Sequence, residues 1–294
     1  MAGGNARRRR TVAVRVGAVT IGGGAPVSVQ SMTKTDTRDV GATVRQLRAL
    51  ARAGCRIGRV AVPDRGALDA FARIRARTTL PLVADIHFDY RLAIACIDAG
   101  ADKVRINPGN IGGTGRLQEV GRRARERGCA IRVGVNAGSL EKELFARHGG
   151  ATPAALVESA AHAIRDLEAV GCTAIVVSLK ASSVPHTIAA YRLAARALRY
   201  PLHLGVTEAG FGLAGIVKSA SSVPRPTGSA IPCASPSPHR RSRRCGSAAR
   251  SSPRSDCSAQ GSRSSRARRA AAAGSTCGGR RARCAAASRI SRSR

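Results

Sequence analysis

The sequence of 294 residues has no tryptophan, and aromatic residues make up only 2% of it. Few flat side chains are therefore available to stack on nucleic-acid bases. No stretch approaches the roughly 18 uncharged apolar residues of a membrane-spanning helix. No two of the nine cysteines have the C-x-x-C spacing, so neither a zinc ribbon nor a redox motif is indicated.

The amino terminus carries an arginine run at residues 7–10, followed by an apolar stretch, as in an export signal. Arg15 interrupts that stretch, and no small-residue cleavage site follows it. A signal peptide is therefore not indicated, and the expected location is cytoplasmic.

Acidic residues are also scarce, because 17 Asp and Glu stand against 50 Lys and Arg, which gives a formal net charge of +33. The excess is +17 over residues 1–220 and +16 over the much shorter segment 221–294. Ser, Arg and Ala make up two-thirds of this tail, and its large apolar residues are Val223, Ile231 and Ile290. So little apolar surface does not offset the entropy of ordering a chain, about 1–2 kcal/mol per residue. We therefore expect a disordered Arg/Ser/Ala-rich tail at 221–294.

The remaining sequence alternates short β-branched runs with helical periods. It predicts strands at 26–32, 56–62, 82–87, 103–107, 131–136, 174–180 and 202–207. Strands joined by helices form a parallel sheet, and their spacing of about 20–30 residues is typical of a TIM-type (β/α) barrel. A doubly wound open sheet is the alternative, but the Gly-rich fingerprint after its first strand is missing.

Local signals bound several of these elements. Asp39 is a predicted N-cap and Gly54 a predicted stop for the first helix. Thr152 and Pro153 begin the fifth helix, which ends at Gly171. Residues 12–16 and 19–21 predict a hairpin beneath the barrel.

Cationic and amide residues collect at the carboxyl ends of the predicted strands, where (β/α) barrels have their active sites. Converging guanidinium and ammonium groups would form a positive cup suited to phosphate or diphosphate oxygens. The Gly-containing loops 107–113 and 136–139 add possible backbone N–H donors. The candidate residues are Arg59, Asp85, His87, Arg105, Arg132, Asn136, Lys180, Thr207 and Glu208.

Each candidate also has a simpler interpretation. An Arg near a strand end often forms a surface ion pair, His87 alone is more often a core histidine than a base, and Asp85 can hold a neighbouring Arg. Their recurrence on successive strand ends favours a site. No metal-ligand spacing occurs in residues 1–220.

Six strings resemble the bacterial and plastid 4-hydroxy-3-methylbut-2-enyl diphosphate synthase family of the non-mevalonate isoprenoid route. They occur in the family's order between residue 11 and Ala220. The strings are VQSMTKTDTRDV, PLVADIHFDYRLA, VRINPGNIGG, IRVGVNAGSLEKEL, SLKAS and LHLGVTEAGFGLAGIVKSA.

The resemblance implies an oxidoreductase with a TIM-type barrel and a second domain that carries a [4Fe–4S] cluster. Its substrate would be 2-C-methyl-D-erythritol 2,4-cyclodiphosphate, opened with two electrons from ferredoxin or flavodoxin and with loss of water, in a homodimer. The resemblance places the diphosphate clamp on one set of residues and the acid near the reacting carbons on Glu208. It assigns no role to Asp85 and His87. The clamp residues would be Arg59, Arg105, Arg132, Asn136, Lys180 and Thr207.

The sequence departs from the family after Ala220. The family's eighth strand and its C-P-x-C cluster ligands have no counterpart, so the resemblance implies an incomplete barrel of seven strands in residues 1–220. The tail's 17 cations are all Arg, a bias that suggests an out-of-frame translation of a G+C-rich gene from about residue 221. The iron–sulfur domain would then be absent, and we expect this chain to be inactive and poorly soluble.

Two other functions compete with this interpretation. A pterin-binding-type barrel transferase would share the fold without electron transfer. A basic nucleic-acid-associating protein would use the Arg/Ser tail for salt-dependent binding, but no recognition fold or specific nucleic-acid site is indicated.

Overall fold

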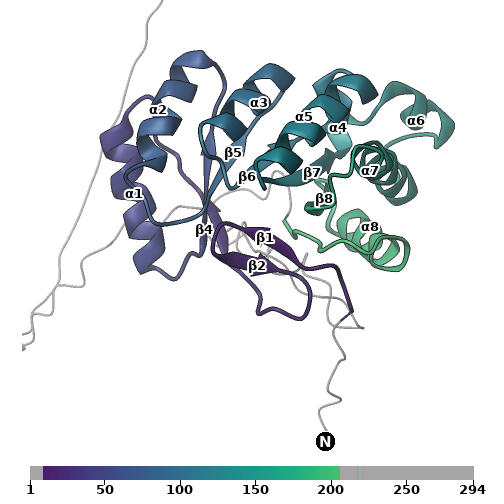
Figure 1. The fold of residues 1–294 in the computed structure, drawn as a ribbon. Helices are drawn as coiled ribbons and strands as arrows, with labels where there is room; N and C mark the ends of the chain where they lie inside the picture. The colour runs from purple at the N-terminus through teal and green to yellow at the C-terminus, as the bar shows by residue number, and fades with distance from the viewer. Residues whose placement is uncertain (1–8, 206–216, 218–220, 222–294) are drawn as a thin grey trace, which may run out of the picture. The chain divides into compact units, whose positions relative to one another are not determined.

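The computed structural model describes residues 9–205 together with Val217 and Ser221. In the described part, six parallel strands form one curled sheet, in which each strand pairs with the next along the chain (Figure 1). The chain therefore has the α/β architecture that the alternating pattern predicts. The strands are β3 (Gln30–Met32), β4 (Ile57–Ala61), β5 (Leu82–Asp85), β6 (Lys103–Ile106), β7 (Ala130–Asn136) and β8 (Ile175–Lys180).

Helices connect consecutive strands and cover the outer face of the sheet, as Figure 1 shows. Two short helical segments, α4 and α6, and one 3-10 turn, η1, follow β6 and β7 at the carboxyl ends of the strands. The helices are α1 (Val40–Arg52), α2 (Arg65–Arg75), α3 (Tyr90–Asp98), α4 (Pro108–Ile111), α5 (Thr114–Glu126), η1 (Ala137–Ser139), α6 (Lys142–Arg147), α7 (Pro153–Glu168) and α8 (Val184–Ala197).

Side-chain caps fix where the long helices begin. Asp39 accepts a hydrogen bond from the backbone N of Ala42 at the start of α1. Thr152 accepts one from Ala155 at the start of α7, whose first residue is Pro153. The sequence predicts Asp39 as a cap and Thr152 with Pro153 as a helix start, and both side chains bind backbone N–H groups that the first turn leaves without partners.

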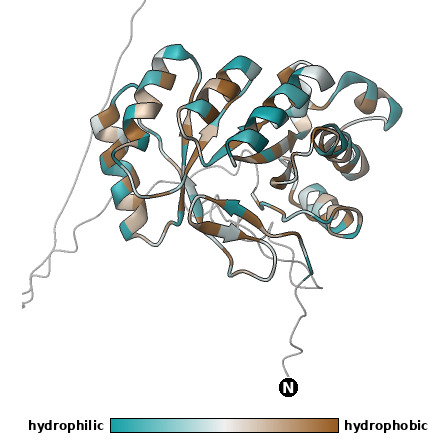
Figure 2. Cartoon of the chain, in the orientation of Figure 1, coloured by the Kyte–Doolittle hydropathy of each residue, from teal (hydrophilic) through white to brown (hydrophobic). Residues whose placement is uncertain are grey.

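The core lies between the sheet and the helices. Alternate strand residues such as Val60, Ile131, Val133 and Val177 are fully buried against the apolar faces of the helices. Figure 2 shows these faces turned towards the sheet and polar residues turned away from it. The other half of each strand points to the concave side of the sheet, because side chains alternate along a strand.

A β-hairpin lies against the amino ends of the strands. It consists of β1 (Val14–Val16) and β2 (Val19–Ile21), which pair antiparallel. Its four buried apolar side chains pack against the first inward-facing residues of the sheet, and together they form a second core cluster. The hairpin thus makes a floor beneath the concave side. The inward-facing residues of this cluster are Ile57, Val83, Ala130 and Val176.

The first and last predicted strands differ from the described ones. The sequence predicts the first strand at 26–32, but pairing begins at Gln30, and Val27 and Val29 remain exposed. The predicted seventh strand at 202–207 is represented by one parallel bridge between Val177 and Leu202. Residues 206 and 207, and the predicted tail except Ser221, lie outside the described residues.

Candidate anion-binding site

Beyond the floor cluster, the inward-facing strand positions carry mainly polar residues. On β7 these positions are Arg132, Gly134 and Asn136, and on β8 they include Ser178 and Lys180. Their neighbours along the strand belong to the apolar core on the other face. The strand period of two therefore separates an apolar outer face from a polar interior.

Asp85 is the carboxylate at the centre of this interior. Its Oδ2 lies 3.8 Å from Nε of Arg59, and its Oδ1 lies 3.6 Å from Nη1 of Arg105. The Nε2 of His87, at the rim, is 3.7 Å from Oδ2. The Asp85 side chain is 7% exposed and that of His87 is 51% exposed, so the pair runs from the buried interior out to solvent. Asp85 therefore holds two arginines from neighbouring strands by charge.

Arg132 is 1% exposed and lies deepest among the predicted clamp residues. Its Nε donates a hydrogen bond of 2.9 Å to Oγ of Ser178, whereas its Nη1 has no partner among the described residues. Burial, together with the nearby charges of Arg59 and Arg105, lowers the pKa of Arg132 to about 9. A guanidinium in this position gains free energy when an anion reaches it, because desolvation and like charges both oppose its charged form.

Arg105 and Lys180 experience the same surroundings. The Nη2 of Arg105 donates to the backbone O of Gly134 at 3.4 Å, and burial lowers the pKa of Arg105 while Asp85 opposes this shift. Burial, reinforced by Arg132 and Arg59, holds the pKa of Lys180 well below its usual value. Among the described residues, four clamp cations thus face one carboxylate. This excess of positive charge is the electrostatic signature of an anion site.

Two further basic residues in the interior were not among the predicted candidates. Lys103 is fully buried on β6, and its Nζ donates to Oε1 of Gln30 at 3.0 Å. His203 is 1% exposed, and neither ring nitrogen has a partner among the described residues. Burial, followed by the charges of Arg132 and Lys180, lowers the pKa of His203 well below its usual value. The position of Lys103, two residues before Arg105 on the same strand face, was the sequence signal that could have identified it.

Two loops lie against each other at the carboxyl ends of β6 and β7. The side chain of Asn107 caps α4 by accepting from Gly109 N at 3.2 Å, and its Nδ2 donates to Oγ of Ser139. A Cβ on Gly109 would lie 2.1 Å from the backbone O of Ser139, so this contact requires glycine. Asn136, just before the second loop, pairs in register with Lys180, and its Oδ1 has no partner within the described part of the chain.

The structure therefore brings seven of the nine predicted site residues to one side of the sheet. Thr207 and Glu208, which complete the predicted set, lie outside the described residues. The other seven are Arg59, Asp85, His87, Arg105, Arg132, Asn136 and Lys180.

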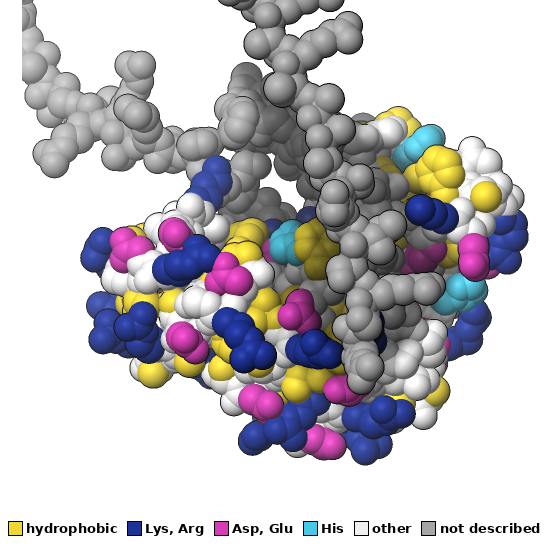
Figure 3. All heavy atoms as spheres, turned by 90° about the horizontal axis from the view of Figure 1, so that it is seen from above, with side chains coloured by type: hydrophobic (Ala, Val, Ile, Leu, Met, Phe, Trp, Pro, Cys, Tyr) yellow, Lys and Arg dark blue, Asp and Glu magenta, His cyan; other side chains and the backbone are white. Residues whose placement is uncertain are grey.

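The outer surface of the helices is charged in a different way. Figure 3 shows Lys and Arg interspersed with Asp and Glu on this face of the molecule. Examples are the pairs of Arg123 with Asp98 at 2.7 Å and of Arg199 with Glu168 at 2.7 Å. Exposed pairs of this kind contribute little free energy and leave no local excess of charge. The helices thus carry cations dispersed among acids, whereas the interior gathers buried cations around one carboxylate, Asp85.

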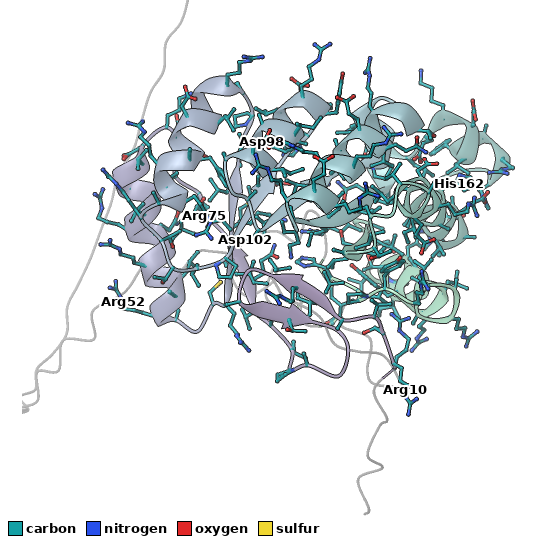
Figure 4. The ribbon with its side chains drawn as sticks, in the orientation of Figure 1. Arg10, Arg52, Arg75, Asp98, Asp102 and His162 are labelled. Atoms are coloured by element: carbon teal, nitrogen blue, oxygen red, sulfur yellow. The ribbon has the colours of Figure 1, made fainter. Side chains whose placement is uncertain are left out.

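A cavity of about 340 Å³ lies near the floor, close to the hairpin. Its lining includes both Arg15 and Arg127 and both Asp98 and Asp102. Figure 4 shows Arg75 beside Asp102, and the Nε of Arg75 lies 3.4 Å from Oδ2 of Asp102. The two arginines and two aspartates that line the cavity balance in charge. The amino end of a (β/α) barrel serves stability rather than catalysis.

The described residues do not fit an iron–sulfur cluster. The described cysteines, Cys55, Cys96, Cys129 and Cys172, are buried and unlinked. Burial raises the pKa of Cys96 and of Cys129 to about 12, which disfavours the thiolates that bind iron. No three His, Cys, Asp or Glu side chains in the described part gather as metal ligands.

No described helix has the length and apolarity needed to cross a membrane.

Residues 11–225 match the family model described as the GcpE TIM-barrel domain. A curated relative from Geobacter sulfurreducens, named 4-hydroxy-3-methylbut-2-en-1-yl diphosphate synthase (flavodoxin), is 54% identical over 213 residues. One of the same name from Anoxybacillus flavithermus is 56% identical over 216 residues. The matches cover 72% and 74% of this chain and 60% and 59% of the relatives. The chain thus spans about three fifths of the length of the curated relatives it matches.

A solved structure with a similar fold is 3-dehydroquinate dehydratase from Geobacillus kaustophilus. The TM-score is 0.50 at 18% identity, and the alignment covers 76% of this chain and 86% of that one. At this identity the likeness concerns the fold alone.

Proposed function

Because this chain belongs to the GcpE TIM-barrel domain family, we propose that its barrel binds a diphosphate ester at the carboxyl ends of the strands. The proposed substrate is 2-C-methyl-D-erythritol 2,4-cyclodiphosphate, and the product is 4-hydroxy-3-methylbut-2-enyl diphosphate. The names of the curated relatives, which contain this product and the word flavodoxin, support the assignment.

One observation carries the proposal. Four clamp cations converge on a buried interior that contributes one carboxylate, Asp85, among the described residues. A diphosphate supplies the missing negative charge, and guanidinium groups match pairs of phosphate oxygens with two parallel N–H donors. A neutral substrate would leave these cations without compensation, at a high desolvation cost.

The proposed roles follow from the positions. Arg59, Arg105, Arg132 and Lys180 bind the diphosphate oxygens, and the register partner of Lys180, Asn136, donates a hydrogen bond from its amide. Asp85 keeps Arg59 and Arg105 apart and oriented. We retain Thr207 as a hydrogen-bonding residue and Glu208 as the acid near the reacting carbons, and leave His87 at the rim without an assigned step.

The overall reaction consumes two electrons and opens the cyclic diphosphate with loss of water. In a complete enzyme of this family a [4Fe–4S] cluster would supply the electrons, flavodoxin would be their donor, and the protein would work as a cytoplasmic homodimer. The described residues contribute binding and orientation of the substrate. The bias of residues 221–294 towards Arg without Lys supports the further proposal that this segment is out of frame, in which case this chain would bind the substrate without converting it.

The two alternative functions have less support. The family match does not favour a pterin-binding transferase. Nucleic-acid association would depend on exposed cations, but on the helices these are interspersed with Asp and Glu, and the sequence offers few aromatic side chains for base stacking.

Isothermal titration of the 294-residue chain with the cyclodiphosphate, and separately with inorganic pyrophosphate, tests the proposal. We expect both to bind, and Arg132→Gln to weaken binding by at least tenfold, since a charged contact contributes about 1.5–3 kcal/mol. Arg48→Gln, on the exposed face of α1, is the matched control and leaves binding unchanged. Absence of binding by the unaltered chain, or equal binding by both variants, contradicts the proposal.

A further inference from the structure

Gly134 of β7 and Ser178 of β8 are direct register partners in the interior of the sheet. We propose that both are positioning residues, which orient Arg105 and Arg132 towards the bound diphosphate. This inference rests on the proposed function. Neither residue carries charge. Each instead acts on one guanidinium, Gly134 by leaving space and Ser178 by accepting a hydrogen bond.

Gly134 makes room for Arg105. A Cβ at this position would lie 2.7 Å from Nε of Arg105 and 3.4 Å from its Nη2. The φ of Gly134 is not in the left-handed region, so the strand backbone itself accepts any residue. A side chain at this position would displace the guanidinium of Arg105, which also donates to the backbone O of Gly134 at 3.4 Å. The guanidinium thus lies close to the bare backbone of β7.

Ser178 fixes the orientation of Arg132. Its Oγ accepts from Nε of Arg132 at 2.9 Å, and both side chains are buried. With Nε engaged, Nη1 is left without a partner among the described residues, although it is buried. A buried donor without a partner costs free energy, which an anion recovers by accepting from it.

The neutrality of these two residues has a chemical purpose. A carboxylate would also orient a guanidinium, but it would neutralise the charge that the diphosphate needs. A hydroxyl and an absent Cβ hold Arg132 and Arg105 in place and leave their charge for the ligand. The arrangement separates orientation from charge balance, because only Asp85 among the described interior residues supplies negative charge.

A double-mutant cycle on the full 294-residue chain tests the role of Gly134, with the dissociation constant of inorganic pyrophosphate as the readout. We expect Gly134→Ala to weaken binding about tenfold, because Arg105 must move. In the Arg105→Ala background both contacts with the guanidinium are gone, and the nearest remaining atom is the backbone O of Ile106 at 3.4 Å, so Gly134→Ala should then have no further effect.

Gly121→Ala is the matched control. Its Cβ would lie 2.9 Å from both Leu167 Cδ2 and Val170 Cγ2, in a contact between helices away from the clamp. We expect it to lower the thermal unfolding midpoint without changing the dissociation constant. If Gly134→Ala alone fails to fold, the double variant Gly134→Ala with Arg105→Ala should fold, and failure of both to fold would overturn the role of Gly134.

The role of Ser178 is tested in the same way. We expect Ser178→Ala to weaken pyrophosphate binding about tenfold in the unaltered chain and to have no effect in the Arg132→Ala background. Equal effects in the two backgrounds, for either residue, would overturn the positioning role. Absence of pyrophosphate binding by the unaltered chain would instead remove the proposed function, so the two failures are distinguishable.

Discussion

The carboxylate of Asp85 lies 3.6 Å from the guanidinium of Arg105, and both side chains are less than a tenth exposed. The two residues are also register partners on β5 and β6, so the sheet itself brings them together. A buried ion pair adds little net stability, but the loss of one partner is costly because the other charge remains in the interior.

Asp85→Asn is therefore expected to lower the free energy of unfolding by about 3 kcal/mol. The physical reason is that Arg59 and Arg105 then share the interior without a counterion. Urea denaturation at pH 7.5 measures the change. Asp69→Asn, at an exposed position of α2, is the control and should be neutral. Equal stability of the two variants would contradict the structural role of Asp85.

Anion binding should take up protons through Lys180. Burial and the neighbouring arginines hold its pKa well below the usual value in the ligand-free interior, and a bound diphosphate raises that pKa again. Between the two pKa values the ligand brings a proton with it, so affinity falls as the pH rises through this window. Titrations with pyrophosphate in buffers of different ionisation enthalpy measure the uptake.

Lys180→Met is the comparison for this experiment, since it removes the titrating group. We expect Lys180→Met to bind pyrophosphate more weakly and to take up fewer protons on binding than the unaltered chain. A heat of binding that is independent of the buffer in the unaltered chain would refute the coupling.

His203 should make the fold sensitive to acid. Burial, followed by Arg132 and Lys180, lowers its pKa in the folded state well below the usual 6.5. Below pH 6.5 the unfolded chain binds a proton that the folded chain does not, so stability falls by about 1.4 kcal/mol per pH unit for this one group.

Denaturation midpoints measured from pH 7.5 to 5.0 follow this slope. His203→Gln should flatten it, whereas His186→Gln, at an exposed position of α8, should leave it unchanged. A slope that persists in full in His203→Gln would assign the acid sensitivity to other groups.

The hairpin floor should contribute to the stability of the whole barrel. Val16 is completely buried in the cluster with Ile57 and Val176, so Val16→Ala is expected to cost about 2 kcal/mol. Thr20→Ala, on the exposed side of β2, should change stability by much less. Chemical denaturation measures the stability of both variants. Equal midpoints would show that the hairpin is dispensable.

The coding DNA offers a test of the composition break. If residues 221–294 are out of frame, an alternative frame downstream of codon 220 should encode a C-P-x-C string. Resequencing this region gives the answer directly. The absence of that string from every frame would refute the frameshift and require another origin for the Arg-rich segment.

The spacing of apolar residues and the local helix caps allowed much of the fold to be predicted. Caps such as Asp39 and Thr152 act within one turn of a helix, and the strands from β4 to β8 follow β-branched runs. The clamp cations were also accessible, because strand ends of a parallel sheet share one edge. The start of β3 was not, since Val27 and Val29 fit a strand locally but precede the paired register, which begins at Gln30, and keep exposed side chains.

The deeper part of the site required the three-dimensional register. Ser178 and Gly134 are ordinary strand residues in the sequence, and their contacts with Arg132 and Arg105 arise from neighbouring strands. His203 was overlooked for the same reason, because its burial depends on which elements close around it, whereas the strand period already placed Lys103 on the face of Arg105.

The hairpin beneath the strands gives the described interior a blind end. A ligand bound at the clamp therefore enters and leaves at the carboxyl ends of the strands. The loops that contain α4 and η1 border this exit, so we expect their mutual contact to influence how long a ligand stays bound.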